Sequence, residues 1–491
     1  MIKSIQHFEE NGIKKLEEVV EKFIKNPTDV ASFVYGIRDN VVQLGLDIIK
    51  ESFEDCDEML RSSGKRRKNW QIVRRDEKKL ITSLGTVNFE KTLFKNKVTG
   101  VSEYLLDRIL EIEDHERITE DAEAKMLEEA VETSYRKAGL EASISDSISK
   151  QTVKNKIHEL KFNSTYENNT KKKKVEYLYI DADEDHVSLQ YREQKGDLIE
   201  NEKHQKNNCL ITKIIYVYEG IENEAPQSKR HKLINPRYFC GVYLGEKENA
   251  TMWDEVYQYI SCNYDLDSVK KIYLNADGGA WIKAGKNRIT GITYVLDEFH
   301  LQKYMIRATS HLLDSAEDVR TELMKSMKNG TKQDFEAVIE KILRVTEGEA
   351  AIKRVNGSKD YILSNWSAVK VRLKNRDTIK GCSAEGHVSH VLSSRMSSRP
   401  MGWSRTGADK MAQLRAYYWN KGNMLELVRN QKKEMPKAVG AEEDAVISCE
   451  EMLRAEKNKH YELGKYVESI SHHVSNEVKK YAWFNTHIWG L

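Results

Sequence analysis

Acidic side chains follow two predicted strands in the middle of the sequence. Residues 175–180 are apolar and aromatic, predict a strand, and are followed by three aspartates: Asp181, Asp183 and Asp185. Asp277 follows another predicted strand, and the two glycines after it would let a substrate approach the backbone closely. Ligands of open α/β sheets bind beyond the carboxyl ends of the strands. Both places therefore predict a ligand site, although each alone is also typical of an ordinary turn.

A third acidic position, Glu385, lies in a segment of unusual composition. Residues 381–404 are rich in Gly, Ser, His and Arg, and include His387, Arg395 and Arg399. A glutamate with two histidines and two arginines nearby indicates a site. The alternative is a helix amino terminus, where the helix dipole favours a glutamate.

Together, the three acidic positions predict a site for magnesium-dependent phosphoryl transfer. Mg²⁺ prefers oxygen ligands and is typically held by a few carboxylates plus substrate phosphate. Two such ions can stabilise the attacking and the leaving oxygen of an in-line displacement. This chemistry needs carboxylates from separate elements that converge at one edge of a sheet.

The elements that would position these residues are those of an α/β domain. The predicted strands cover residues 175–180, 210–218, 237–244, 269–275 and 292–296, with a helix at 251–261. Asp297 can cap the helix after the last strand, and His300 lies one turn further on, so capping alone explains this pair. Residues 305–375 predict helices only, which would make an all-α insertion in the α/β core.

The residues before this core predict a mostly helical region with a small β unit. Residues 1–60 have helical periodicity, and residues 80–106 alternate apolar and polar side chains as an antiparallel hairpin does. The Ser/Asn/Thr-rich segment 163–170 and the four lysines after it predict a flexible linker and a domain boundary near residue 170.

Charge is distributed unevenly along the chain. The whole sequence holds 79 Lys+Arg and 77 Asp+Glu, but residues 61–100 hold 12 basic and 3 acidic side chains. A basic run that contains an aromatic side chain, here Trp70, can follow phosphates and stack on a base. The contacts that this run predicts with DNA are Arg66, Arg67 and Lys68.

A second DNA-binding element is predicted just before the linker. Residues 130–140 predict one helix, 141–147 a short connection, and Ser149 an N-cap for a helix over 150–160. In a helix-turn-helix, the second helix places its side chains in the major groove, although any two helices joined by a turn give a similar pattern. The predicted contacts from this helix are Lys150, Lys154 and Lys156.

Composition argues against several other classes of protein. No apolar run approaches the roughly 20 residues that span a bilayer. The first ten residues lack the apolar core of a signal peptide. The six cysteines are scattered without a CxxC pair, which argues against a disulfide framework or structural zinc and fits a reducing cytoplasm.

Four segments carry a resemblance to a known family. They are ADEDHVSLQ (182–190), NADGGAWIK (275–283), VLDEFHLQKY (295–304) and GCSAEGHVSHVLSSRMSSRPMGWS (381–404). They resemble the ISLre-two family of bacterial insertion-sequence transposases, which was long filed as an uncharacterised protein family. The last segment is long and compositionally unusual, which makes the match specific. The resemblance covers most of the chain, more weakly before residue 70.

The resemblance implies an Asp-Asp-Glu site on an RNase H-like fold, a mixed sheet with flanking helices. It implies that Asp183, Asp277 and Glu385 are the catalytic acids and hold two Mg²⁺ or Mn²⁺ ions, with Asp181 as the alternative first acid. Asp183 is favoured because an acid four residues before Val187 fits related transposases. Asp277 and Glu385 are 108 positions apart, which leaves room for the helical insertion of the wider group.

Accessory residues also follow from the resemblance. Related transposases have a Cys or Asp, two residues and then a His after the second acid, and Asp297 and His300 match that pattern. The side chains that could position the phosphate or stabilise its charge are His300, His387, Arg395 and Arg399.

The function that the resemblance implies is DNA transposition, a form of DNA recombination. The enzyme would bind element ends, hydrolyse the DNA to free a 3′-OH, and join that 3′-OH to target DNA. It would act as a homo-oligomer, associated with the nucleoid in the bacterial cytoplasm. The alternatives are a transposase-derived DNA-binding protein without catalysis and a metal-dependent nuclease that cuts without joining.

The predicted organisation has five parts. They are a helical region (1–60), a DNA-binding region (61–170), the first part of the catalytic core (171–304), the α-helical insertion (305–375), and the rest of the core with carboxyl-terminal helices (376–491).

Overall fold

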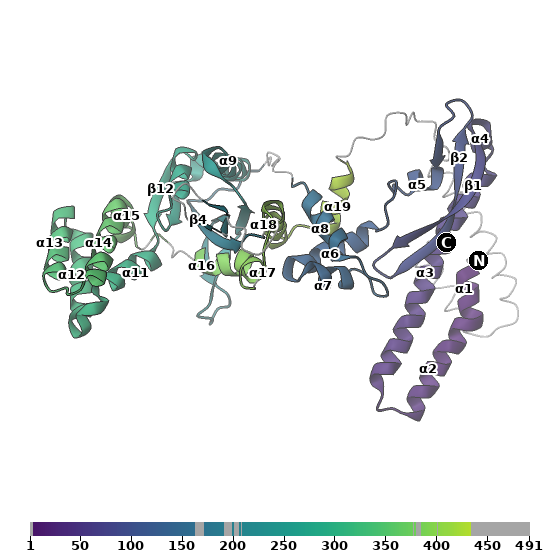
Figure 1. Ribbon diagram of the computed structural model, residues 1–491, viewed down its shortest axis with the longest axis horizontal. Helices are drawn as coiled ribbons and strands as arrows, with labels where there is room; N and C mark the ends of the chain where they lie inside the picture. The colour runs from purple at the N-terminus through teal and green to yellow at the C-terminus, as the bar shows by residue number, and fades with distance from the viewer. Residues whose placement is uncertain are drawn as a thin grey trace. The chain divides into compact units, whose positions relative to one another are not determined.

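The computed structural model describes residues 3–162, 171–190, 199–200, 206–207, 209–376, 378–379, 384–399 and 401–433. These residues form two compact units, which Figure 1 draws as ribbons. The first contains the described residues of 1–129, 136–150 and 425–433, and the second contains those of 130–135 and 151–424. The predicted linker 163–170, Cys382 and the aromatic carboxyl end lie outside the description.

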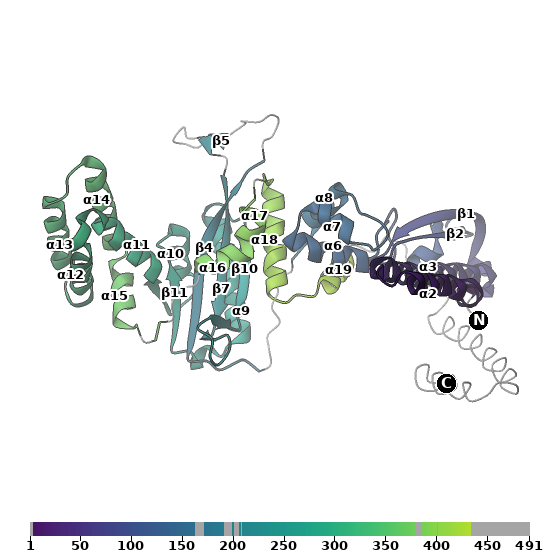
Figure 2. The ribbon, with the colours of Figure 1, turned by 90° about the horizontal axis from the view of Figure 1, so that it is seen from below.

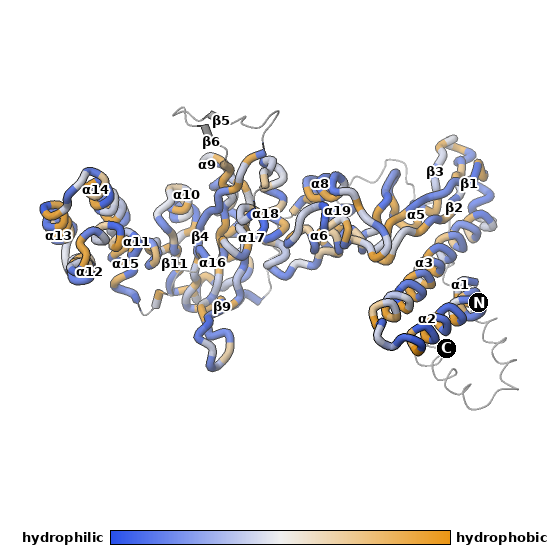
Figure 3. The backbone as a smooth tube through the Cα atoms, turned by 60° about the horizontal axis from the view of Figure 1, so that its bottom comes forward, coloured by the Kyte–Doolittle hydropathy of each residue, from blue (hydrophilic) through white to orange (hydrophobic). Residues whose placement is uncertain are grey.

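The first unit begins with the helices that the sequence predicts for its first 60 residues. They are α1 (Lys3–His7), the π-helical turn η1 (Phe8–Gly12), α2 (Ile13–Lys25) and α3 (Val30–Ser62). Apolar and polar positions alternate along α2 and α3 in Figure 3, as expected of amphipathic helices. The rings of Phe23 and Phe33 stack 4.5 Å apart and join these two helices.

The β unit of the first unit is longer than predicted. After α4 (Gly64–Asn69) come the antiparallel strands β1 (Trp70–Ile81), β2 (Thr86–Asn96) and β3 (Ser102–Tyr104). The predicted hairpin started at residue 80, but β1 pairs with β2 from Trp70 onward. The charged stretch belongs to the strand because it pairs with β2, although residues 71–75 are exposed on both faces of the strand.

The helices after the β unit only partly match the predicted helix-turn-helix. They are α5 (Leu105–Ile109), α6 (Glu120–Glu132), α7 (Tyr135–Glu141) and α8 (Lys150–Glu159). The helix predicted for 130–140 is wrong, because α6 ends and α7 begins within it. The helix predicted for 150–160 is confirmed as α8. Most of α7 belongs to the first unit and α8 to the second, so their use as a helix-turn-helix stays a prediction.

The second unit is built on a mixed sheet of five strands. In spatial order they are β10 (Arg237–Gly241), β7 (Cys209–Tyr218), β4 (Tyr177–Ser188), β11 (Lys271–Ala276) and β12 (Ile292–Leu296). The first three pair antiparallel, and β4, β11 and β12 pair parallel. All five predicted strands are present. Two two-stranded ribbons, β5–β6 (Ile199–Glu200, Lys206–Asn207) and β8–β9 (Gly220–Asn223, His231–Ile234), were not predicted.

Strand β4 continues through the acidic residues instead of ending before them. Its pairing with β7 extends to Ser188. Because side chains alternate along a strand, Asp181, Asp183 and Asp185 share one face and Ala182 lies on the other. Ala182 belongs to the apolar core.

Helices cover both faces of this sheet. The core on one face includes Leu178, Ile180 and Trp253, the last from α9 (Gly245–Asn263). The opposite face is covered by α16 (Ala384–His387), the π-helical η5 (Val388–Ser393), α17 (Ser394–Met396) and α18 (Arg405–Trp419). Figure 2 shows α16, α17 and α18 beside β4 and β7. Short helical turns α10 (Ala280–Lys283), η2 (Leu266–Ser268) and η3 (Ala284–Asn287) connect the strands.

The described part of residues 305–375 is helical, as the sequence predicts. It contains the end of α11 (Glu298–Thr309), then η4 (Ser310–Ser315), α12 (Ala316–Asn329), α13 (Lys332–Arg344), α14 (Glu349–Ser364) and α15 (Trp366–Lys374). These helices share an apolar core that includes Phe335, Ile339 and Ile362. A capping box between Thr331 and Asp334 begins α13.

The last described helix, α19 (Met424–Lys433), belongs to the first unit. Its Lys432 pairs with Glu116 and its Arg429 with Glu120. The two compact units therefore do not follow our five-part division, which stays a prediction. In the described part of the chain, no helix is long and apolar enough to cross a membrane.

Candidate functional site

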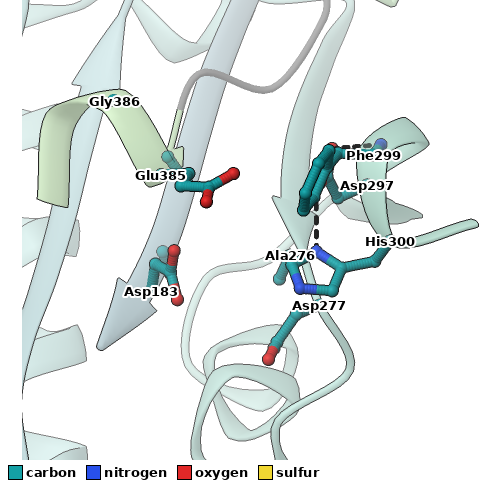
Figure 4. Close-up of a pocket in the computed structure, with 10 residues that line it drawn as sticks. Asp183, Ala276, Asp277, Asp297, Phe299, His300, Glu385 and Gly386 are labelled. Carbon is teal, nitrogen blue, oxygen red and sulfur yellow. Dashed lines mark hydrogen bonds and ion pairs between the residues drawn. The ribbon is translucent and has the colours of Figure 1, made fainter. Parts of the chain in front are cut away.

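One pocket of the second unit brings together acidic residues from distant parts of the sequence. Asp183, Asp277 and Glu385 line this cavity of about 230 Å³. Figure 4 shows the carboxylates of Asp183 and Glu385 on one side of it and the Asp297–His300 pair on the other. Five residues that the sequence singles out therefore meet in one place. The rest of the lining consists of Ala182, Ala276, Phe299, Ala384 and Gly386.

Asp183 reaches the pocket because of the register between two parallel strands. Asp181 of β4 pairs with Asn275 of β11, so Asp183 follows two residues later on the same face of β4, and Asp277 follows in the turn after Ala276, the last residue of β11. Burial raises the pKa of Asp183 to about 6, and the negative charge of Asp277 adds to this, while the Glu184 amide works against it. The carboxylate of Asp183 is thus costly to ionise without a nearby cation.

We expect Asp183→Asn to stabilise the metal-free protein. A carboxyl whose pKa rises from 3.8 on folding binds its proton more tightly in the folded state, so its ionisation favours unfolding. The gain should be on the order of 2 kcal/mol at pH 8, shrink as the pH falls through about 6, and vanish near about pH 4. Unfolding by urea in EDTA measures it. A variant that is less stable than the wild type at pH 8 would contradict this account of the site.

Asp277 lies in a turn that the helical insertion holds in place. Its Oδ1 accepts a hydrogen bond of 2.9 Å from the Gly279 amide, and the hydroxyl of Tyr361 donates to its backbone oxygen. Gly278 has φ +108°, and a Cβ there would lie 3.1 Å from Nδ2 of Asn365. Only glycine fits this position without strain.

Glu385 is presented by the short helix α16, and His387 attaches that helix to the sheet. Glu385 is exposed. Two residues further on, the ring of His387 packs 4.7 Å from the ring of Tyr216. Nδ1 of His387 also shares a hydrogen bond of 2.9 Å with the Tyr238 hydroxyl. Burial lowers the pKa of His387 to about 4, so the ring is neutral near pH 7. His387 therefore has a structural role, and its predicted contact with phosphate stays a prediction.

Asp297 and His300 combine the two roles that the sequence left open. Asp297 caps α11 by accepting a hydrogen bond from the Phe299 amide, and its Oδ2 lies 2.9 Å from Nδ1 of His300. This hydrogen bond raises the pKa of His300, and the negative charges of Asp297, Asp277 and Asp183 raise it further against the opposing effect of burial. The pocket therefore favours an imidazolium facing the carboxylates.

The donor atoms suit a hard divalent cation, but they do not form a complete metal site in this structure. Carboxylate oxygens are the ligands that Mg²⁺ prefers. Among the described residues, no group of three His, Cys, Asp or Glu side chains is close enough to hold a metal ion. Ion binding would therefore have to draw the three carboxylates closer together.

Comparison with known proteins places the chain in a family. Residues 23–434 match the model of an uncharacterised protein family, UPF0236. The chain belongs to this family. UPF0236 protein TTE2489 of Caldanaerobacter subterraneus subsp. tengcongensis is 34% identical over 87% of each chain. A second protein of that strain, named by a series of loci that starts at TTE0033, is 34% identical over 87% of this chain and 85% of its own. The UPF0236 protein in vanSb 3'region of Streptococcus gallolyticus is 23% identical over 70% of this chain and 72% of its own.

In this UPF0236 protein, the alternative first acid, Asp181, does not line the pocket. Asp181 is fully buried and accepts hydrogen bonds from the Tyr216 hydroxyl at 2.8 Å and from the Asn275 amide at 2.7 Å. Asp185, on the other side of Asp183, accepts a bond of 2.8 Å from Ser397. Of the three aspartates on this face of β4, only Asp183 lines the pocket.

Arg395 is also corrected from a phosphate ligand to a structural residue. It is 4% exposed, and its Nε donates a hydrogen bond of 3.0 Å to the backbone oxygen of Ala130. The guanidinium lies 5.1 Å from the ring centre of Trp403. A buried guanidinium needs such partners, which leaves it unable to reach a substrate. Arg399 is exposed but does not line the pocket.

The residues predicted to contact DNA fall into two groups. Arg66 is 6% exposed, and its guanidinium donates to the backbone oxygens of Leu60, Arg61 and Trp70, so its predicted DNA contact is corrected. The second group keeps its predicted DNA contacts as predictions, because its side chains are exposed: Arg67, Lys68, Lys150 and Lys154, with Lys156 partly exposed.

Sequence reasoning missed the residues that support the pocket from behind. Tyr361 holds the turn of Asp277, Asn365 lies close to Gly278 in that turn, and Phe299 contributes to the lining. Tyr361 lies 84 positions from Asp277 and stands in an ordinary helical pattern. No short motif connects the two, so only the fold could reveal their contact.

Proposed function

We propose that this UPF0236 protein is a DNA transposase that cuts the ends of its own element and joins them to target DNA. The observation that carries the proposal is that Asp183, Asp277 and Glu385 come from three separate elements and line one pocket. We further propose that it acts as an oligomer on two DNA ends in the bacterial cytoplasm, close to the nucleoid.

The chemistry of the pocket supports this function. In the proposal, the three carboxylates hold two Mg²⁺ or Mn²⁺ ions, which when bound polarise a phosphate and activate the attacking oxygen. His300, whose pKa is raised by its hydrogen bond with Asp297, faces the same space and in its protonated form can donate a hydrogen bond to a phosphate oxygen. Asp297 orients that ring through Nδ1, which leaves Nε2 as the donor for substrate.

The architecture is compatible with the RNase H-like fold that the resemblance implies. The second unit has a mixed five-stranded sheet with helices on both faces. The first two proposed acids lie at adjacent parallel strands, β4 and β11. The helices α12–α15 fall between the second acid and Glu385 in the sequence, where the related transposases carry a helical insertion.

The name of one relative adds an independent argument. It joins eleven locus numbers of a single strain. A gene product with that many loci in one genome is what a self-propagating element leaves behind. An ordinary housekeeping enzyme has no reason to be encoded so often. This favours a mobile element as the source of the family.

A basic surface of the first unit is the proposed contact with DNA phosphates. The turn after β2 lies against α4, because Nζ of Lys97 donates a hydrogen bond of 2.6 Å to the backbone oxygen of Arg67. The amide of Lys97 donates at 2.8 Å to the backbone oxygen of Asn69. The exposed cations of this surface are Arg67, Lys68 and Lys97.

We expect the triple variant Arg67→Ala, Lys68→Ala, Lys97→Ala to bind DNA more weakly in a salt-dependent way. Each lost phosphate contact should reduce the slope of log affinity against log salt by about one. Fluorescence anisotropy with labelled duplex DNA at several salt concentrations measures this slope.

The matched control removes three exposed lysines from α2 in the same unit: Lys14, Lys15 and Lys22. If both triple variants change the slope equally, the effect comes from net charge and the assignment to this surface is wrong. Arg66→Ala should instead lower the free energy of unfolding.

The test of the proposed function is a reaction with DNA that carries the sequences flanking the gene. The purified protein is incubated with this DNA and a target plasmid, in Mg²⁺ or in EDTA. Cut ends together with joined product, in Mg²⁺ only, would support the transposase. Cutting without joining would indicate a metal-dependent nuclease and would overturn the proposal.

A DNA-binding protein without catalysis is the second candidate. The described residues hold no preassembled group of metal ligands, which favours it. This candidate predicts specific binding to the element ends with no cut product in either Mg²⁺ or Mn²⁺. That result in the same assay would replace the first proposal with the second.

A further inference from the structure

A chain of buried polar side chains lies directly behind the candidate site. Nδ2 of Asn275 donates a hydrogen bond of 2.7 Å to Oδ1 of Asp181, and Nη2 of Arg372 donates one of 3.1 Å to Oδ1 of Asn275. Asp181 and Asn275 are 0% exposed and Arg372 is 3% exposed. The chain thus connects β4, β11 and α15 inside the second unit.

Two of these hydrogen-bonded side chains lie close to the acids of the pocket in the sequence. Asp181 and Asn275 are paired residues of adjacent parallel strands. Asp183 is two residues further along the same face of β4, and Asp277 lies in the turn just after β11. A side-chain bond between Asp181 and Asn275 therefore fixes the spacing of the two strands just before the acids.

Arg372 connects the helical insertion to the same strand ends. Its Nε donates a hydrogen bond of 3.0 Å to the backbone oxygen of Leu296, the last residue of β12. Asp297, the partner of His300, follows directly. One guanidinium thereby restrains the ends of both β11 and β12.

Two tyrosines complete the bonding of the carboxylate. The hydroxyl of Tyr216 donates to Oδ2 of Asp181 at 2.8 Å, and the hydroxyl of Tyr218 donates to Oδ1 at 3.2 Å. Burial of a carboxylate and a guanidinium has a desolvation cost, and replacing such groups by hydrophobic side chains of similar size is often neutral or stabilising. Stability alone therefore does not explain this arrangement.

We propose that Arg372 and Asn275 are positioning residues that, with Asp181, fix β4 and the end of β11, from which Asp183 and Asp277 close on divalent ions. The inference rests on the proposed function for the role of those ions. It adds a task for the helical insertion, which would set the geometry of the acids through α15. Partners behind metal ligands commonly affect ion affinity by about 10- to 100-fold.

The experiment is a titration of the full chain with Mn²⁺ alone, with free Mn²⁺ followed by electron paramagnetic resonance. We expect Arg372→Met and Asn275→Ala each to raise the half-saturating Mn²⁺ concentration at least about tenfold. Arg372→Lys keeps the charge but lacks the planar pair of donors, so it should give a similar rise. Circular dichroism shows which variants are folded. Because three variants are made, the test can rest on the folded ones if one of them fails to fold.

The matched control is Asp57 of the first unit, a buried carboxylate that accepts two hydrogen bonds. It is 0% exposed and accepts from the amide of Thr92 at 2.9 Å and from its hydroxyl at 2.6 Å. Asp57→Asn should lower the melting temperature but leave the Mn²⁺ midpoint within about twofold. A general loss of stability therefore cannot imitate the expected result.

A swap of two side chains tests the bond itself. Asp181→Asn alone removes the charged acceptor of this bond, whereas Asp181→Asn with Asn275→Asp restores a charge-assisted bond between one carboxylate and one amide. We expect the double variant to bind Mn²⁺ more tightly than Asp181→Asn. Failure of this rescue would contradict a positioning role for the bond.

The results separate the two proposals. Folded Arg372 and Asn275 variants with wild-type Mn²⁺ midpoints would overturn the positioning inference and leave the proposed function standing. Wild-type protein that binds Mn²⁺ with the expected variant effects but cuts no DNA would overturn the proposed function alone. Absence of Mn²⁺ binding by the wild type would overturn both.

Discussion

Asp183→Asn is expected to reduce Mg²⁺-dependent DNA cleavage at least about a thousandfold. An ion that stabilises charge in the transition state contributes several kcal/mol, and each 1.36 kcal/mol is about a factor of ten in rate. Asp183 lines the pocket and is costly to ionise without a cation, so its loss removes one of the three carboxylates that would hold the ions.

Asp181→Asn gives the decisive comparison. Its carboxylate is enclosed by Tyr216, Tyr218 and Asn275 and lies outside the pocket lining. We expect this variant to weaken ion binding but to recover cleavage at saturating Mg²⁺, whereas Asp183→Asn does not recover. Initial rates of nicking over a range of Mg²⁺ concentrations distinguish the two. Recovery of Asp183→Asn, with Asp181→Asn inactive, would make Asp181 the first acid.

Arg415→Met is expected to destabilise the second unit by about 3–5 kcal/mol. Arg415 is 0% exposed and donates to the backbone oxygens of Val131, His390 and Val391. Its Nη2 also donates a hydrogen bond of 3.0 Å to Ser394 Oγ. Each buried acceptor left without a donor costs about 1–3 kcal/mol, and methionine replaces the volume but none of the bonds.

The control for this prediction is Arg405→Met in the same helix. Arg405 pairs with Glu248 at the surface, where their side chains are 55% and 45% exposed, so its loss should cost less than about 1 kcal/mol. Urea unfolding followed by tryptophan fluorescence measures both variants. Equal effects would show that the buried hydrogen bonds of Arg415 do not hold η5 and the end of α6 in place.

The sequence predicts the strands and the acidic positions well because both are local signals. Apolar runs such as 210–218 and 292–296 identify the five strands of the sheet, and all five are present. Asp277 could be placed because it follows such a run and precedes two glycines. The end of β4 could not be placed from the sequence, because the pairing of β4 with β7 overrides the turn that an acidic segment favours.

The arginines show where local reasoning fails. Arg66 and Arg395 stand in polar, basic segments that favour exposure, but both are buried with their guanidinium groups bonded to backbone oxygens. An arginine can extend a long apolar stem into the interior when carbonyls there need donors. Whether such carbonyls are nearby depends on distant elements, as the bond from Arg395 to Ala130 illustrates.

The supporting residues could not be predicted for the same reason. Arg372 lies 97 positions from Asn275, and helical periodicity around it gives no sign that its side chain reaches a strand of the sheet. The acids of the pocket share a chemical type that can be sought in the sequence. The residues that hold them in place share only a position in the fold.

The central claim is that Glu385 acts with Asp183 and Asp277, although it is 108 positions from the latter. The most direct test compares Mg²⁺-dependent cutting of element-end DNA by the wild type and by Glu385→Gln. Glu385 is exposed, so the variant should fold normally and bind the DNA as the wild type does. We predict that it cuts at least about a thousandfold more slowly. Cutting by Glu385→Gln at the wild-type rate would contradict the account.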